Sequence, residues 1–294
     1  MALLFALVID PVASDDRRET YSATFTAVDP DGPVLPLGEL SAQRGDGVFE
    51  SIGVVDGHPQ EVGPHLERLA HSARLVDLPA PNPEQWREAI ARVAAEAGEE
   101  ELVIKLILSR GVEQGSSPTA WITLATAPDN VVARTDGVGV VTLDRGYQLD
   151  VPGRAPWLLL GAKTLSYAVN MAAIREAKRR GADDAVFVTS DGYVLEAPTA
   201  SVILRFGDRF VTPEPNAGIL HGTTQLSLFA YLDRRGFATA YEAVLLSDLR
   251  TADAAWLLSS VRLAAPISAV DGVEKAVDRA LTDELNAYLL SPRN

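Results

Sequence analysis

The stretch GAKTLSYAVN occupies residues 161–170 and contains Lys163. The chain has only four lysines against twenty-two arginines, so a fixed positive charge is normally supplied by arginine. An amine, unlike a guanidinium, can lose its proton near neutral pH and attack a carbonyl carbon. The stretch therefore makes Lys163 a candidate nucleophile. The simpler interpretation is a lysine whose stem packs on apolar surface while its amine reaches water.

The composition limits the classes of function. The chain has 294 residues, enough for two domains or one large domain, with a net charge of −14 and a pI of about 4.7. This acidity disfavours nucleic-acid backbones and anionic membrane surfaces as partners. The absence of cysteine excludes disulfides and thiolate metal sites, and the four histidines lack the close spacing of metal ligands. We therefore expect no metal site, and we expect the histidines at the surface or at helix caps.

The N-terminal run MALLFALVIDPVA is apolar, but no basic segment precedes it and it breaks at Asp10-Pro11. Signal peptides carry such a basic segment, and the run is too short to span a bilayer. We interpret it as a first strand, and we expect a cytoplasmic protein that does not act at a membrane.

Periodicity and turn residues predict strands and helices in both halves of the chain. Asp56-Gly57 predicts a type I′ turn in a hairpin over 48–62, and Asn82 predicts the cap of a helix over 83–97. The polar stretch 127–137 is the best candidate for a linker. Segregated strands and helices predict an α+β fold. The remaining predicted elements are helices over 64–78, 164–180, 223–236 and 273–290, and strands within 101–111, 118–127, 138–144, 184–197 and 199–213.

Four further motifs carry polar residues beside apolar strands or at helix starts. Arg68 lies in HLERL on the polar side of its predicted helix, and Glu196 follows the apolar strand of GYVLEAPTAS. GILHGTTQLS predicts a glycine-bearing turn that opens a helix, where free amides can bind a phosphate. LLSSVRLAAP places hydroxyls after a buried strand. Each motif alone has a simpler interpretation: a solvated side chain, a strand end, a hydrated helix terminus or a turn cap.

The order of these motifs resembles the class IV, or fold-type IV, aminotransferase family. The order is RGDGVFES, HLERL, a lone lysine before a helix, VLEAPTAS, GILHGTT and a strand that ends in two serines, over about Arg44 to Gly272. The family includes branched-chain aminotransferases, D-amino-acid transaminases, (R)-selective amine transaminases and aminodeoxychorismate lyases, which all use pyridoxal 5′-phosphate (PLP). KTLSYAVN and DGYVLEAP are most similar to the actinobacterial branch named aminodeoxychorismate lyase or D-amino-acid transaminase.

The resemblance implies a two-domain fold. It predicts a smaller N-terminal α/β domain over 1–126, an interdomain linker over 127–137 and a larger, β-barrel-like cofactor-binding domain over 138–294. It also implies a homodimer whose sites are lined from both subunits. The apolar strand 48–55 supports a dimer, because one chain is expected to leave it partly uncovered.

The resemblance also assigns roles to the candidate residues. Lys163 matches the catalytic lysine that bonds to the PLP aldehyde and then moves a proton between the substrate Cα and the cofactor. Glu196 matches the carboxylate that keeps the pyridine nitrogen protonated, so that the ring accepts electrons.

Further side chains are assigned to the cofactor phosphate and ring. Arg68 matches the arginine that binds the phosphate, Thr223 and Thr224 match the phosphate-binding turn, and Ser260 matches a further hydroxyl. Tyr167 is assigned to the phenolic oxygen of the cofactor, although the family's usual tyrosine lies one position later.

The sequence departs from the family pattern at the expected substrate pocket. Residues 196–201 read EAPTAS where the family reads E-G-x-x-x-N, and Thr199 is expected to line the pocket. No Arg-x-His element, which binds the substrate carboxylate in D-amino-acid transaminases, follows the S-R-G turn. Arg44 is the first candidate to replace it, with an interdomain salt bridge as its alternative role, and Arg110 is the second. Phe49 replaces the usual tyrosine of GDGVYE, which removes a hydroxyl from the pocket.

We therefore expect a PLP-dependent transaminase that moves an amino group from a D-amino acid or an (R)-amine to a 2-oxo acid. A branched-chain L-amino-acid aminotransferase ranks behind these. The alternative is a 4-amino-4-deoxychorismate lyase, which eliminates pyruvate in folate synthesis with the same lysine and ring. A non-enzymatic cofactor-binding protein is the third interpretation, and the joint presence of Lys163, Arg68 and Glu196 disfavours it.

Overall fold

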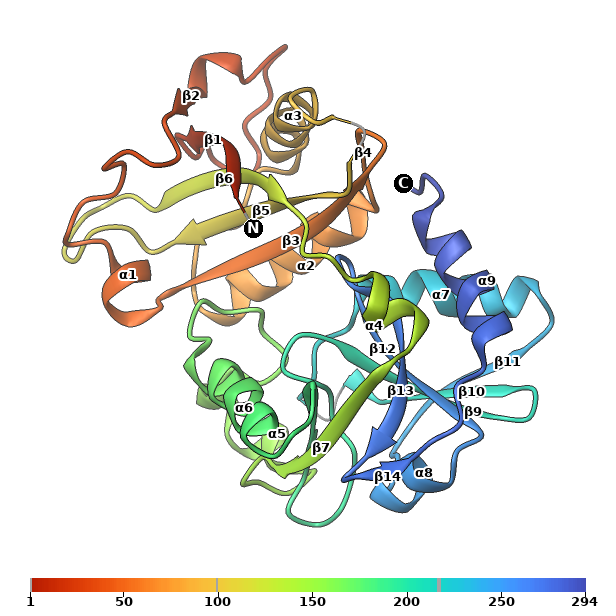
Figure 1. Cartoon of the computed structure of the whole chain (residues 1–294). Coiled ribbons are helices and arrows are strands. Elements are labelled where there is room, and N and C mark those ends of the chain that lie inside the picture. The colour runs from red at the N-terminus through yellow and green to blue at the C-terminus, as the bar shows by residue number, and fades with distance from the viewer. Residues whose placement is uncertain (1, 99, 216–217) are drawn as a thin grey trace. The chain divides into compact units, whose positions relative to one another are not determined.

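The chain divides into two compact units, and each is described by itself. Unit 1 comprises Met1–Pro128, Ala162–Tyr167 and Ser291–Asn294, and unit 2 comprises Asp129–Gly161 and Ala168–Leu290. The computed structural model describes residues 2–98, 100–215 and 218–294 (Figure 1). Among these residues, no helix is long and apolar enough to cross a membrane.

Unit 1 contains an antiparallel sheet, which in its described residues has six strands in the order β2-β1-β6-β5-β3-β4. The predicted hairpin is confirmed, because β3 and β4 pair across Asp56 and Gly57, whose φ angles are 49° and 72°. Positive φ at both residues is what a type I′ turn requires. β1 confirms the predicted first strand, whose Met1 lies outside the described residues. The strands are β1 (Leu3–Ile9), β2 (Phe25–Val28), β3 (Gly47–Val55), β4 (His58–Pro59), β5 (Leu102–Ser109) and β6 (Thr119–Thr126).

Two helices pack on this sheet. α2 (Val62–Leu75) contacts β3, and α3 (Pro83–Ala94) contacts β1 and β6. The predicted cap of α3 is confirmed, because Asn82 Oδ1 accepts hydrogen bonds from the N–H groups of Glu84 and Gln85 at 3.1 and 3.0 Å. A third, short helix, α1 (Leu40–Arg44), precedes β3.

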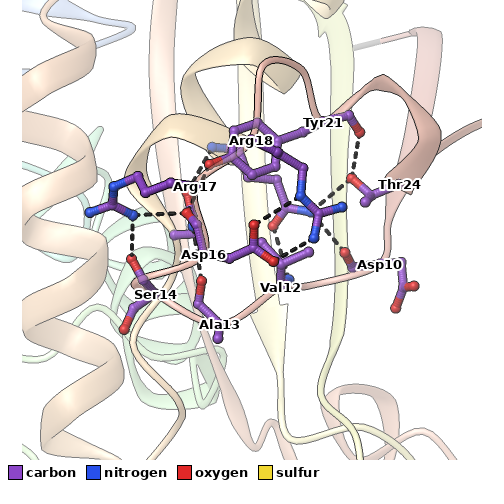
Figure 2. Close-up of polar contacts among 11 residues, drawn as sticks. Asp10, Val12, Ala13, Ser14, Asp16, Arg17, Arg18, Tyr21 and Thr24 are labelled. Carbon is purple, nitrogen blue, oxygen red and sulfur yellow. Dashed lines mark hydrogen bonds and ion pairs between the residues drawn. The ribbon is translucent and has the colours of Figure 1, made fainter.

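The connection between β1 and β2 is ordered by local polar contacts (Figure 2). Arg18 pairs with the Asp16 carboxylate, and Arg17 Nη1 donates to the Asp16 carbonyl at 2.9 Å. Tyr21 Oη donates to the same carbonyl at 3.0 Å, and Thr24 Oγ1 donates to the Tyr21 carbonyl at 2.7 Å. These contacts hold the 3-10 turn η1 (Ser22–Thr24) in place before β2 begins.

Unit 2 contains a mixed, partly closed sheet. Its strands follow the order β11-β10-β9-β12-β13-β7-β8, and β14 pairs with β13. Isolated bridges join Val194 to Val188 of β8, and Tyr193 to Leu245 just after β11, so one segment links the two ends of the sheet. This arrangement confirms the predicted barrel-like character. The strands are β7 (Val138–Asp144), β8 (Asp184–Val188), β9 (Ser201–Phe206), β10 (Arg209–Pro213), β11 (Ala238–Glu242), β12 (Ala254–Ser259), β13 (Leu263–Val270) and β14 (Val273–Glu274).

The central strands of unit 2 are buried on both faces. Val202 and Leu204 of β9 belong to one hydrophobic cluster, whereas Ile203 between them belongs to a second cluster with Trp256 of β12. A strand buried on both faces needs a continuous apolar run, and β9 and β12 both have one. The helices are α4 (Val131–Thr135), α5 (Val151–Arg154), η2 (Pro156–Leu158), α6 (Ala168–Arg179), α7 (Thr223–Arg234), α8 (Leu246–Thr251) and α9 (Arg279–Leu290).

Several predicted elements differ from the structure. The helix predicted over 164–180 begins only at Ala168, because the residues before it bond to β3, and unit 1 therefore includes 162–167. The helix predicted over 273–290 begins at Arg279, because Val273–Glu274 pairs with β13.

The structure adds detail to the predicted linker stretch and to the strands predicted within 184–197. The linker stretch 127–137 holds α4, which packs on β13. β8 ends at Val188 and a turn follows, after which the chain returns to β8 through the bridge of Val194 and the bond from the Leu195 N–H to the Phe187 carbonyl at 2.9 Å.

Candidate active site

Lys163 lies on a short extended segment that is fixed to β3 and α2. Thr164 forms an antiparallel bridge with Val48, and the Phe49 N–H donates to the Lys163 carbonyl at 3.0 Å. The Lys163 N–H donates to Ser72 Oγ of α2 at 3.1 Å. Because both backbone groups of Lys163 are bonded, its side chain projects from a fixed Cα.

Phe49 forms the surface against which the Lys163 amine lies. Lys163 Nζ is 4.4 Å from the centroid of the Phe49 ring, and Tyr167 meets the same ring edge-on with centroids 5.4 Å apart. The Phe49 side chain is buried. An aromatic face attracts a cation and excludes water from that side of it. The structure therefore brings together Lys163, Tyr167 and Phe49, three of the predicted site residues.

A buried carboxylate and a buried histidine hold Arg68. Glu50 Oε1 accepts from Arg68 Nε at 2.7 Å, and Glu50 Oε2 accepts from Arg68 Nη2 at 2.8 Å. Oε2 of the same carboxylate lies 2.7 Å from His65 Nδ1. The side chains of Glu50 and His65 are fully buried, and that of Arg68 is 11% exposed. One edge of the guanidinium is thus taken by Glu50, which sets the orientation of Arg68.

The electrostatics of this cluster follow from burial and charge. Burial would raise the pKa of the Glu50 carboxyl, but the Arg68 guanidinium and the His65 ring lower it well below its ordinary value. Burial also lowers the pKa of His65, and the bond to Glu50 opposes this shift. A carboxylate only accepts, so neutral His65 donates to it from Nδ1.

The cluster corrects two interpretations of the sequence. The prediction that the histidines lie at the surface or at helix caps is wrong for His65, because this ring is fully buried. Arg68 is not a solvated helix residue, since its side chain is mostly buried against Glu50. The signal that could have found the cluster is the H-x-x-R spacing in HLERL, which places both side chains on one helix face.

Glu196 of unit 2 is fixed at both its backbone and its carboxylate. The Phe187 N–H donates to the Glu196 carbonyl at 2.8 Å, and the Leu220 N–H donates to Glu196 Oε2 at 3.1 Å. The turn that follows is tied to α6, because Asn170 Nδ2 donates to the Pro198 carbonyl at 2.6 Å. These hydrogen bonds therefore fix the direction in which the Glu196 carboxylate points.

Three hydroxyls meet at the N-terminus of α7. Ser260 Oγ lies 3.3 Å from Thr223 Oγ1 and 3.2 Å from Thr224 Oγ1, and both threonines are buried. The N-cap is Gly222, and a Cβ on it would lie 2.3 Å from Ser201 Oγ of β9. Glycine thus lets α7 begin close to this strand. Hydroxyls and helix N-terminal amides together favour a bound phosphate.

Arg134 of α4 holds the turn that carries Ser260. Arg134 Nη2 donates to the Val261 carbonyl and Arg134 Nε donates to the Arg262 carbonyl, both at 3.0 Å. Arg134 is buried, so these bonds are shielded from water. Sequence reasoning missed this residue, because a single arginine in the polar stretch 127–137 gives no signal for such a contact.

Of the predicted substrate-binding residues other than Phe49, the two arginines each pair with a carboxylate. Arg44 pairs with Glu113 of the same unit at 3.4 Å, and both side chains are exposed. Arg110 pairs with Asp46 through bonds of 2.7 and 3.2 Å, and its Nη2 also donates to a backbone carbonyl. Thr199 is exposed in the turn after Glu196. Each arginine is therefore already engaged by an acidic partner.

These residues fit PLP in their chemistry. Unit 1 offers the Lys163 amine, which can bond to an aldehyde. Unit 2 offers a fixed carboxylate, which can face a ring nitrogen, and a group of hydroxyls at a helix N-terminus, which can bind a phosphate.

Comparison with known proteins agrees with this donor set. A family model described as amino-transferase class IV matches residues 47–270. The chain is 45% identical over 255 residues to the bifunctional aminodeoxychorismate lyase / D-amino acid transaminase of Mycobacterium tuberculosis, which covers 83% of this chain and 88% of the relative.

Two solved structures are similar over nearly the whole chain. Fold IV-transaminase CpuTA1 from Curtobacterium pusillum has a TM-score of 0.92 and 48% identity, covering 97% of each chain. A PLP-bound structure, described as a hypothetical aminotransferase from Mycobacterium tuberculosis, has a TM-score of 0.90 and 39% identity, covering 99% of this chain and 100% of that chain.

The fold, the donor set and these similarities define a PLP-dependent enzyme that acts on amino groups. The chain belongs to the class IV aminotransferase family. The resemblance drawn from motif order is thereby confirmed, as are the α+β fold class and the PLP cofactor. Its reaction is that of a class IV aminotransferase or lyase, and the family implies a small amino donor and a 2-oxo acid as substrates.

Proposed function

We propose that this enzyme transfers an amino group from a D-amino acid or an (R)-amine to a 2-oxo acid. The observation that carries the proposal is the 45% identity, over 83% of this chain, to a relative named for D-amino acid transamination and for aminodeoxychorismate lysis. A similarity of this extent supports a shared substrate class.

Lys163 performs the proton transfers in this proposal. Bound PLP supplies an aldehyde carbon and an electron-accepting ring. Lys163 Nζ would hold the cofactor aldehyde and, as a free amine, would take the proton from the donor Cα. The fixed backbone of Lys163 and the Phe49 ring restrict where this amine can reach. The same Nζ would carry that proton to the cofactor.

The remaining site residues bind and orient. The Glu196 carboxylate, directed by the Leu220 N–H, holds the proton on the ring nitrogen. The hydroxyls of Thr223, Thr224 and Ser260 and the first amides of α7 bind the phosphate, with Arg68 as a further charged donor. We assign Tyr167 to the phenolic oxygen of the cofactor.

An absorbance experiment tests the proposal. The purified protein should be yellow, and D-alanine without an oxo acid should remove the visible band, because the amino group stays on the cofactor. Addition of 2-oxoglutarate should restore the band. No change with D-alanine or with (R)-1-phenylethylamine, but a change with L-leucine, would assign the enzyme to branched-chain L-amino acids instead.

Aminodeoxychorismate lyase activity is the second candidate function, because the same relative carries both names. A lyase returns its cofactor to the starting form in every turnover, so 4-amino-4-deoxychorismate should release pyruvate without lasting loss of the visible band. Pyruvate release together with no response to D-alanine would make the lyase the main activity.

We also propose a homodimer, although on a different surface from the one expected. The strand 48–55 is largely buried within the chain, so it does not supply the exposed apolar surface that the sequence suggested. Trp157 and Leu158 of η2, and Val169 and Met171 of α6, are exposed instead. An active monomer in light scattering at micromolar concentration would refute the dimer.

A further inference from the structure

Lys105 of β5 lies on the same side of the sheet as Phe49. In the β3–β5 pairing, Phe49 is opposite Ile107 and Ser51 is opposite Lys105. Directly paired residues share a face and alternate residues return to it, so these four side chains lie on one face. Lys105 Nζ is 5.0 Å from the centroid of the Phe49 ring.

Two of the chain's four lysines therefore lie against one aromatic ring. Lys163 Nζ is 4.4 Å from the ring that Lys105 Nζ contacts at 5.0 Å. Both amines, the ring and the strands that carry them belong to unit 1. The Phe49 ring thus places both amines in one part of unit 1.

Lys105 differs from the other cations near this part of the fold in having no acidic partner. Across residues 2–98, 100–215 and 218–294, Lys105 Nζ has no hydrogen bond and no ion pair, while its side chain is exposed. Arg68, Arg110 and Arg44 are each paired with a carboxylate. Partial loss of hydration also lowers the pKa of the Lys105 ammonium. A reachable cation without an anion is available for an anionic ligand.

We propose that Lys105 Nζ binds the α-carboxylate of the amino donor and of the 2-oxo acid. The inference rests on the proposed function, in which Lys163 is the amine that reacts at the donor nitrogen and Cα. The carboxylate of an amino acid is one bond from that Cα, so its binding cation must lie near the reacting amine. Lys105 meets this condition, because it shares the Phe49 ring with Lys163.

Steady-state kinetics with two donors test the proposal. Lys105→Met keeps the length of the side chain and removes its charge, and Lys105→Arg keeps the charge. D-alanine has the carboxylate, and (R)-1-phenylethylamine lacks it. We expect Lys105→Met to lower kcat/KM for D-alanine about tenfold to a hundredfold, the range of one charge-assisted contact, mainly through KM. Lys105→Met should leave kcat/KM for the amine donor unchanged, because this ratio reports only on the donor half-reaction. Lys105→Arg should recover part of the loss in kcat/KM for D-alanine.

Controls separate recognition from damage. Lys178→Met, at an exposed lysine of α6, removes an equal charge and should change kcat/KM for neither donor. The PLP affinity of the Lys105→Met apoprotein should equal that of the wild type. Calorimetry with pyruvate on borohydride-reduced protein gives a readout without turnover, and Lys105→Met should bind pyruvate at least about tenfold more weakly.

Three outcomes would overturn the inference. Equal losses on both donors would show that Lys105 supports the fold, a loss of PLP affinity would assign it to the cofactor, and unchanged pyruvate binding would exclude a carboxylate contact. A wild-type protein that binds no PLP and uses neither donor would instead refute the proposed function, and the Lys105 assignment with it.

Discussion

Replacing Glu50 by glutamine tests the buried cluster behind Arg68. Glu50→Gln preserves the shape of the side chain but leaves the Arg68 guanidinium without its counter-charge at a site only 11% exposed. Loss of one partner of a buried pair costs about 3–5 kcal/mol. We expect the lower end, about 3 kcal/mol, because the glutamine amide oxygen still accepts one hydrogen bond. For a protein of this size, that corresponds to a fall in Tm of about 6–12 °C.

The assay is thermal unfolding of the apoprotein at pH 7, followed by circular dichroism, because a bound phosphate would supply Arg68 with a second counter-charge. The matched control is Glu67→Gln, because Glu67 is the exposed neighbour of Arg68 on α2 and should change the free energy of unfolding by about 0.5 kcal/mol at most. A loss below about 1 kcal/mol for Glu50→Gln would refute the reasoning, since it would place Arg68 effectively in water.

Glu50→Gln should also change how the thermal stability depends on pH. The lowered pKa of Glu50 means that its contribution is present above the ordinary value of 4.5 and is lost as pH falls through the folded-state pKa. The pKa of His65 is also lowered, so the unfolded chain takes up a proton below pH 6.5 that the folded chain excludes. The free energy of unfolding therefore falls further as pH drops below 6.5. Glu50→Gln should therefore flatten the dependence of Tm on pH below 4.5. An unchanged slope there would show that Glu50 is not the titrating group.

Three further predictions concern the cofactor. Borohydride reduction should fix PLP to Lys163, and peptide mass spectrometry that finds the label on another lysine would refute the assignment. Arg68→Ala should weaken PLP binding to the apoprotein about tenfold to a hundredfold, and an unchanged titration would mean that Arg68 only neutralises Glu50. Arg134→Met should weaken PLP binding more than pyridoxal binding, because it frees the turn that carries Ser260, and Arg134→Lys should restore part of the difference. Equal losses for both ligands would indicate general damage.

Local sequence signals predicted the parts of the fold that depend on neighbouring residues. The Asp56-Gly57 hairpin and the Asn82 cap each depend on a few adjacent residues, so the sequence contains the whole interaction. The roles of Lys163 and Glu196 rest on the order of the motifs and on the side chains that PLP chemistry needs, and they stay predictions.

Contacts between distant residues were not predictable in this way. The segment 164–167 looked helical, but its backbone bonds to β3, and Lys163 bonds to Ser72 across 91 positions. Such tertiary partners override helix propensity. The sequence gives no signal for Lys105, because its relation to Lys163 exists only through the Phe49 ring.

The close approach of β9 to α7 has a consequence for how this enzyme can diverge. Ser201 Oγ lies 2.3 Å from the place that a Cβ on Gly222 would take, so the two positions share one small volume. The family pattern ends in asparagine at the position of Ser201, so the residue at this position differs from the family pattern beside a helix N-cap. A side chain at position 222 is therefore compatible with β9 only if the Ser201 hydroxyl turns away, so the residues at the two positions depend on each other. Directed evolution should vary the two positions as a pair, because a side chain at Gly222 requires the Ser201 hydroxyl to move.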